Sequence, residues 1–516
     1  EYVKIPENTA ILGALKLTGK TAGGLSIGIL ESLTSTEYAR ISSPEDDYKR
    51  ISEPMTNYFA GRIQKDINNS NTIIGGMITS TYRNLDKDYL YFMGRSAITG
   101  GIDFKHFIMN RTFSIDFKAM GSQINGDHEA ITMLQRESSR YYQRPDAPHL
   151  NIDTTSSFIR GTGGSLEVIK GANGNWRYGA GVHWISPGLE LNDMGFQSMA
   201  DMIMEGQMVG YVENTPKWIF RQFEFNISQL NLWNFGGEYL GSEFEFESEL
   251  SFKNRWSFHA NIDREGKELD GRLLRGGPGV YTFGTTGQDY FLSTDQAKKL
   301  QFGVGYEYEF SDDKVSNQHE FHAELNWKVT NSLLVSPQFG FNRILDNYQY
   351  ISNDDLENQG KYLLGRLNRK TYEFTLRASY AVSPELTIQY YGSPYLTMGT
   401  YTDFKSLANH ETGKPGEVFR SYDPTEIIYN SVDRIYTIDP LSVSFDNPDF
   451  NFREFRSNLV ARWEYRPGSV FYLVWTHSRG SSEAITNHSL DYNIDKLFDE
   501  HASNVFLLKF NYWFSL

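Results

Sequence analysis

A row of carboxylates is the clearest chemical feature of this sequence. Because alternate residues of a β-strand point to one side, glutamates at every second position would form an acidic wall, which nearby strands would extend. The glutamates concerned are Glu243, Glu245, Glu247, Glu249, Glu307, Glu309, Glu320 and Glu324. Such a wall would favour cations or dock a basic segment. Alternatively, it is an ordinary solvated polar face whose carboxylates pair with Lys and Arg on neighbouring strands, such as Lys328 and Arg377.

Catalytic and metal-binding patterns are not recognisable. His319 and His322 look like a metal pair, but their odd separation places them on opposite faces of a strand. The glycine-rich segment 161–165 lacks the spacing of a nucleophile elbow. We therefore expect no catalytic residue, no metal site, no cofactor and no enzymatic activity.

Segment 400–449 is a second candidate for function, because it is far longer than an ordinary connection between strands. Its aromatic residues are Tyr401, Phe404, Phe419, Tyr422, Tyr429, Tyr436 and Phe445. So many rings, mixed with prolines, disfavour random disorder. The segment could fold inward as a plug, lie over an opening, or dock a partner.

The period that positions these residues is that of β-strands. Between Leu240 and Phe252 the even positions are largely apolar, while the odd positions carry the four carboxylates. A turn at Asn254 and Arg255 follows, and the alternation resumes from Trp256, which predicts a hairpin. The same alternation recurs at 113–119, 302–310, 320–329 and 372–380.

The connections between these strands alternate between short and long. The short turns contain Gly, Pro, Asn, Ser or paired charges, and lie at 20–23, 68–70, 109–111, 171–174, 216–217, 254–255, 297–299, 331–332, 383–385 and 466–468. The long polar stretches are 42–54, 125–153, 189–205, 268–279, 346–360, 400–449 and 480–500. Tight periplasmic turns and long extracellular loops are typical of transmembrane barrels.

Composition agrees with a barrel in a membrane. Aromatic residues make up 15% of the chain although only 39% is hydrophobic, and the mean hydropathy is −0.48. No apolar stretch approaches the roughly 18 residues of a spanning helix. A net charge of −15 argues against a nucleic-acid partner. We predict an all-β, large antiparallel transmembrane β-barrel in the bacterial outer membrane, in contact with its lipid and lipopolysaccharide.

The strand number is expected to be even. We count about 21 strands, whereas single-chain bacterial barrels have even numbers, so we predict roughly 22, within about 20 to 24. The first strand, from Ala10 to Gly19, enters a short turn and so descends from outside. An upward strand should precede it, and no signal peptide is present. Residues 1–516 then form a single barrel that ends in an aromatic strand at Asn504–Leu516.

Three segments carry a resemblance to a known family. They are the opening hairpin from Ile11 to Leu30, the segment from Pro187 to Asp201 and the loop from Arg275 to Gly279. They resemble an uncharacterised outer-membrane barrel family of Bacteroidota, in which a periplasmic domain similar to carbohydrate-binding family 9 precedes the barrel. This sequence departs from that pattern because residues 1–516 show no such domain: either it was cleaved, disordered or omitted, or this member never had it. The resemblance implies no established activity.

Two functions stay open. A wall of about 22 strands encloses a lumen too wide for side chains alone to fill. The chain could therefore be a channel or transporter for a nutrient, glycan or peptide. Alternatively, it is a non-transporting subunit or scaffold of a complex for protein secretion, barrel assembly or surface-lipoprotein export, with other outer-membrane proteins or lipoproteins as partners. A plug domain like that of TonB-dependent receptors is not recognisable, which weakens active import.

Overall fold

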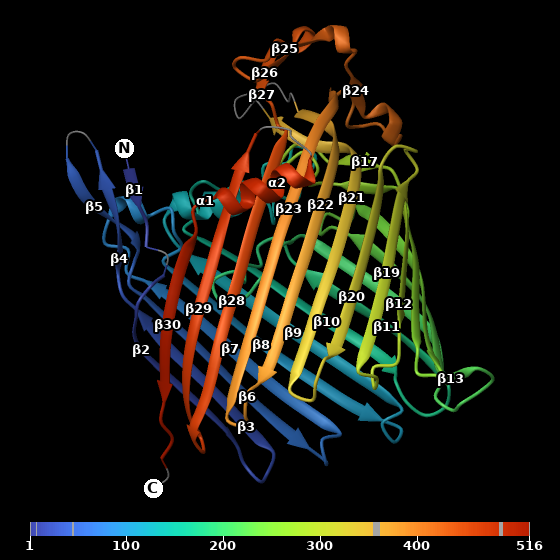
Figure 1. The fold of residues 1–516 in the computed structure, drawn as a ribbon. Coiled ribbons are helices and arrows are strands. Elements are labelled where there is room, and N and C mark those ends of the chain that lie inside the picture. Colours follow the sequence, from blue (N-terminus) through green and yellow to red (C-terminus); the bar gives the residue numbers. More distant parts are fainter. Residues whose placement is uncertain (1, 7, 44–45, 354–361, 485–488, 515–516) are drawn as a thin grey trace. The chain divides into compact units, whose positions relative to one another are not determined.

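The computed structural model describes residues 2–6, 8–43, 46–353, 362–484 and 489–514. Its main element is one antiparallel sheet of 22 strands (Figure 1). Of these, 21 have nine residues or more in the described chain, and β24 (Phe419–Ser421) is a short strand paired with β23. The long strands are β2 (Ile11–Lys20), β3 (Leu25–Thr34), β6 (Thr56–Ile67), β7 (Thr72–Arg83), β8 (Ser96–Ile108), β9 (Phe113–Asn125), β10 (Phe158–Lys170), β11 (Trp176–Ile185), β12 (Met202–Glu213), β13 (Phe220–Trp233), β14 (Tyr239–Phe252), β15 (Ser257–Glu265), β18 (Thr285–Ser293), β19 (Leu300–Ser311), β20 (Asn317–Lys328), β21 (Leu333–Asn353), β22 (Tyr362–Ala381), β23 (Leu386–Leu407), β28 (Phe450–Arg466), β29 (Ser469–Glu483) and β30 (Ser503–Asn511).

The smaller elements lie in the long connections. Three small sheets are formed by β1 (Tyr2–Lys4), β4 (Glu37–Ser42) and β5 (Asp47–Glu53), by β16 (Glu268–Asp270) and β17 (Val280–Thr282), and by β25 (Ile427–Asn430), β26 (Ile435–Ile438) and β27 (Val443–Asp446). The helices are α1 (His128–Arg136), α2 (Leu490–Asp499) and the 3-10 turns η1 (Asp88–Leu90), η2 (Pro415–Glu417), η3 (Pro424–Glu426) and η4 (Asp439–Leu441). Among the described residues, we find no helix with the length and apolar character needed to span a membrane.

The chain divides into two compact units. Unit 1 comprises Glu1–Tyr211, Ile227–Glu243 and Glu268–Val280, and unit 2 comprises Val212–Asn226, Phe244–Lys267 and Tyr281–Leu516. Most of the acidic row and the aromatic segment 400–449 belong to unit 2. The elements of each unit are described below within that unit.

The strand pattern predicted from the sequence is confirmed. The 21 long strands match the number counted from the sequence, the 22 strands of the sheet lie within the predicted range, and each of the ten predicted short turns joins two consecutive long strands. The hairpin predicted around Asn254 is formed by β14 and β15. The last two residues of the predicted terminal strand and residues 354–360 of one predicted loop lie outside the described part of the chain.

Every predicted long loop contains some regular structure that the sequence did not predict. Strand β5 lies in stretch 42–54, β12 begins in 189–205, β16 lies in 268–279, and β21 continues to Asn353 in 346–360. Stretch 125–153 contains α1, stretch 480–500 contains α2, and stretch 400–449 begins inside β23, which continues to Leu407. Both α-helices start at a side-chain cap, since Asp127 accepts from the Glu129 N–H and Ser489 from the Tyr492 N–H. Polarity and length therefore do not separate an irregular loop from a short amphipathic helix.

Each strand separates an apolar from a polar face. In unit 2, Tyr306 lies opposite Phe321, and Phe321 opposite Phe341, so rings continue across β19, β20 and β21 on one side. Tyr306 and Phe321 are among the exposed large hydrophobic residues. In a barrel this face contacts lipid, whereas the alternate, polar face lines the interior. All residues of the two end strands of the ladder, β2 and β30, are exposed.

Candidate functional site

Strand register brings polar residues of five strands into one row on the interior face. Asn261 of β15 lies opposite Asp289 of β18. Asp289 lies opposite Glu307 of β19, and Glu307 opposite Glu320 of β20. Asn342 of β21 continues the row opposite Glu320. Three carboxylates thus lie at one level on adjacent strands. Strand alternation predicts the face on which each carboxylate lies, but it does not predict which carboxylates lie opposite one another.

The remaining predicted carboxylates lie close to this row. Glu309 is opposite Gln318 and Glu324 is opposite Gly303 on the paired strands β19 and β20. The four glutamates Glu243, Glu245, Glu247 and Glu249 are all in β14. The sequence therefore predicted an acidic face that spans β14, β19 and β20, but it did not include Asp289.

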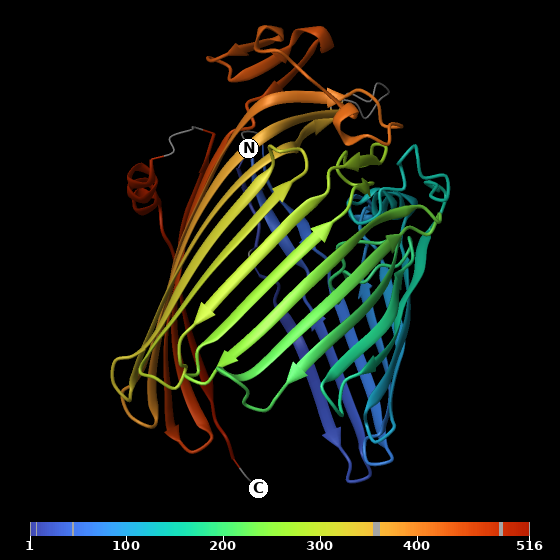
Figure 2. The ribbon, with the colours of Figure 1, turned by 90° about the vertical axis from the view of Figure 1, so that its right-hand side faces the viewer.

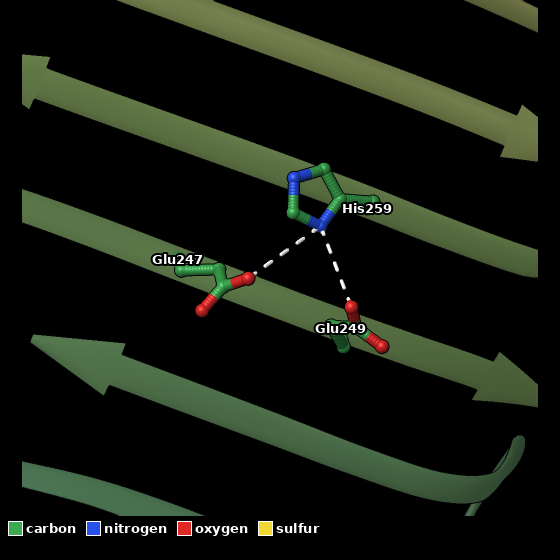
Figure 3. Close-up of side chains that lie close together, drawn as sticks. All are labelled: Glu247, Glu249 and His259. Carbon is green, nitrogen blue, oxygen red and sulfur yellow. Dashed lines mark ion pairs between the residues drawn. The ribbon is translucent and has the colours of Figure 1, made fainter. Parts of the chain in front are cut away.

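His259 is the centre of a cluster within this face (Figure 3). Its Nδ1 lies 4.0 Å from a carboxylate oxygen of Glu247 and 3.8 Å from one of Glu249. Its Nε2 lies 3.6 Å from an oxygen of Asp289. The imidazole therefore lies among carboxylates of β14 and β18.

The ligand atoms of Glu247, Glu249 and His259 lie within 4.8 Å of one another, a spacing that could hold a metal ion. Two-thirds of the Glu249 side chain is exposed, and exposed clusters of this kind are common without an ion. We assign no metal to it. Sequence spacing could not reveal the cluster, because His259 comes from the neighbouring strand.

Neutral amides donate to Glu307 and Glu320 of the row and to Glu247 of β14. Gln318 Nε2 donates to Glu307 at 3.1 Å, and Asn342 Nδ2 donates to Glu320 at 2.6 Å. Asn226 Nδ2 donates to Glu247 at 3.2 Å. An amide satisfies a carboxylate oxygen without neutralising its charge, so the face keeps a negative potential.

Lys328 and Arg377 do not neutralise this face. Neither forms an ion pair with the carboxylates of residues 247, 249, 307, 309, 320 or 324 in the described chain. Arg377 instead donates to Gln338 at 2.9 Å. The two cations that exemplified the alternative interpretation therefore do not pair with these six carboxylates.

The two histidines of the predicted metal-like segment lie on opposite faces, as expected. His319 accepts or donates a hydrogen bond with the Tyr306 hydroxyl at 2.8 Å on the apolar face. His322 stacks on Phe291 with ring centres 5.3 Å apart. A Cβ on Gly305, opposite His322, would overlap the imidazole, so this glycine lets the ring lie across the strand.

In unit 1, loops cover the interior face of the sheet. Helix α1 packs its Ile131 against Ile124 of β9 and Ile159 of β10. Ser122 of β9 accepts the Glu190 N–H at 2.9 Å, which fixes the loop between β11 and β12 on the same face. Apart from the length of the two loops, no feature of the sequence predicted this inward packing.

The aromatic residues of segment 400–449 pack on one another. Phe404 and Tyr422 are buried, and Tyr401, Tyr436 and Phe445 surround them. Tyr429 stacks on Tyr436 with centroids 4.4 Å apart, and Phe419 contacts Tyr348 at 5.4 Å. The segment folds into the sheet β25 to β27, which lies beyond the ends of β22 and β23 (Figures 1 and 2). The rings thus stabilise the segment itself.

Residues 1–515 match the family described as a domain of unknown function, DUF5916. The chain belongs to this family. No curated protein matches the sequence. A wide sheet with one apolar and one polar side to every strand is the architecture of bacterial outer-membrane barrels, and the protein resides in that membrane.

A comparison with solved structures finds outer-membrane proteins of low similarity. The outer membrane transporter YddB from Escherichia coli is 9% identical over 96% of this chain and 67% of its own, with a TM-score of 0.42. The siderophore receptor PiuA from Acinetobacter baumannii is 9% identical over 92% and 78%, with a TM-score of 0.43. The FrpB iron transporter from Neisseria meningitidis is 7% identical over 90% and 74%, with a TM-score of 0.40. These values carry no information about cargo.

Proposed function

We propose that this family member is a channel or transporter of the outer membrane, for a nutrient, glycan or peptide, with an interior that favours cations. The observation that carries the proposal is the row of Asp289, Glu307 and Glu320 on adjacent strands of the polar face. Three carboxylates at one level attract counter-ions, since Glu307 and Glu320 accept from neutral amides and Asp289 lies beside the imidazole of His259. The proposal includes no catalytic step and no cofactor.

The inward-packed loops of unit 1 support a gated rather than a freely open path. A loop that covers the interior face of the sheet narrows the lumen that this face would line. The gate could be formed by these loops, or by a periplasmic domain of the kind that the family resemblance implies. We propose that this domain and an additional first strand precede the barrel, and that the protein comes from a member of the Bacteroidota. We also propose lipopolysaccharide and surface lipoproteins as its partners.

Conductance of the purified protein in planar bilayers tests the proposal. A conducting barrel should give discrete current steps, and a gradient of potassium chloride should give a reversal potential with the sign of cation preference. Barrels that insert but do not conduct, before and after proteolytic removal of surface loops, would refute transport. That result, together with stable co-purification of other envelope proteins, would favour the scaffold function.

A further inference from the structure

Helix α2 lies on the lipid-facing side of the sheet in unit 2. Leu497 is fully buried against Leu396 and Met398 of β23, with Tyr372 of β22 beside them. Tyr372 lies opposite both Phe341 and Leu396, so these side chains continue the apolar face and not the polar row. Figure 2 shows α2 standing at the flank of β28 and β29.

The helix covers a charge that would otherwise face lipid. Arg453 of β28 lies opposite Leu396 and is completely buried. Its Nε donates to Ser481 at 2.9 Å and its Nη1 to Asn493 of α2 at 3.0 Å, and it pairs with Glu483. A guanidinium on the outer face of a barrel is unfavourable in hydrocarbon. Helix α2 covers this guanidinium and supplies Asn493 as a partner, while Ser481 and Glu483 of β29 supply the others.

The surface of α2 is divided into three stripes. Leu497 and Asn493 face the sheet. Leu490, Ile494 and Phe498 recur every four residues and form an exposed apolar stripe beside it, with exposed fractions of 39%, 39% and 51%. Asp491, Asp495 and Asp499, one residue further on, form an exposed acidic stripe. A helix in free solution has no reason to expose an apolar stripe next to its buried side.

The strands below α2 show at which depth it lies. Arg479 of β29 extends over the Phe498 ring, 5.6 Å from its centroid. Four residues along β29, Trp475 stacks on Phe506 of β30 at 6.2 Å, and Leu473 then lies opposite Leu508. Charge, then indole, then aliphatic side chains is the order expected from headgroups to acyl chains. The apolar stripe of α2 is continuous with this lipid-facing surface.

We propose that α2 is an interfacial helix. Its stripe of Leu490, Ile494 and Phe498 inserts among the outer-leaflet acyl chains, and its acidic stripe faces the headgroups and water. The occupant of the exposed apolar stripe is therefore membrane lipid. This inference depends on the location of the barrel in the membrane and not on conduction, so a non-conducting barrel leaves it unchanged.

Single nitroxide labels test the orientation, because the natural sequence contains no cysteine. The full chain is reconstituted in nanodiscs of phosphatidylcholine and phosphatidylglycerol, with labels at I494C and at the adjacent D495C. Two reference variants are L508C in β30 for lipid and V432C, which is 88% exposed in the β25–β26 turn, for water. Folding of each variant is checked by its heat-modifiable gel mobility.

The expected result is a split between neighbouring residues. The label at 494 should collide with oxygen as the L508C label does, whereas the label at 495 should collide with a water-soluble nickel chelate nearly as the V432C label does. Nickel accessibility at both positions would place α2 in water and overturn the proposal. Protection of both positions from both reagents would mean that protein covers the helix, and would equally overturn it.

Discussion

The guanidinium of Arg140 donates to the carboxylate of Glu190, although the two residues lie 50 positions apart and both are buried. The same guanidinium also donates to the backbone oxygen of Leu189. These bonds join the loop that follows α1 to the loop between β11 and β12. One buried cation therefore links two of the inward-packed loops of unit 1.

Replacement of Arg140 with methionine should release this pair of loops. Glu190 would keep its buried carboxylate without a charged partner, which typically costs about 3 to 5 kcal/mol. Hydrogen exchange of residues 186–201 should accelerate accordingly, while exchange in β9 and β10 should change little. The exposed Arg136, at the end of α1, offers a matched control as R136M. Equal exchange in R140M and the wild type would contradict the role of this ion pair.

Asp146 gives the same loop region a dependence on pH. Burial by itself would raise the pKa of Asp146, but the hydrogen bond and charge of Arg144, and the N–H of Gly279, hold it below its ordinary value of 3.8. The depressed pKa means that the carboxylate stabilises the contact above pH 3.8, and that this stabilisation is lost as the pH falls through the lowered value. Exchange of the Gly279 amide, corrected for its intrinsic rate, should therefore rise only in strong acid.

The D146N variant should show, at neutral pH, the fast amide exchange that the wild type shows only in acid. Its Gly279 amide should exchange faster at pH 7, and its exchange should depend less on acid than that of the wild type. D86N is a suitable control because Asp86 is exposed. A D146N protein with the exchange profile of the wild type would show that other contacts hold residues 268–280.

Phe404 should anchor the folded part of segment 400–449. It is 3% exposed and its ring lies 4.9 Å from Tyr436 and 5.1 Å from Phe445. F404A should destabilise this segment by about 3 to 5 kcal/mol. Limited proteolysis should then cut between 419 and 446 while the long strands resist. V432A changes an exposed side chain in the same segment, and a similar cleavage rate in both variants would refute the anchor.

The sequence predicted the strands well, because membrane and interior impose opposite polarities on alternate residues. Glu307 and Phe302 are examples, because each has a residue of the same polarity two positions further along its strand. The face of a side chain can therefore be predicted from the few residues around it. The ten short turns could also be predicted from neighbouring residues alone. Strand alternation also assigned the glutamates of β14, β19 and β20 to one face.

The site itself depends on register, which a single strand does not contain. His259 meets Glu249 only because β15 pairs with β14, and Asp289 joins Glu307 only through the pairing of β18 with β19. The same limit explains why Arg140 and Glu190 were missed. It also explains α2, whose Leu497 is identified as a core residue only when Met398 lies beneath it.

The carboxylate row should determine ionic selectivity if the barrel conducts. Glu307 and Glu320 are isosteric with glutamine, and their amide partners can hydrogen-bond to either form, so E307Q/E320Q should fold normally. Removal of two of three adjacent charges should lower the cation to anion permeability ratio by about twofold or more. Reversal potentials in a tenfold potassium chloride gradient measure this change. E417Q, which removes an exposed loop carboxylate paired with Lys414, should leave the ratio unchanged. A ratio that is the same in all three proteins would show that ions do not pass the acidic row, and would move the selectivity of the channel to its loops.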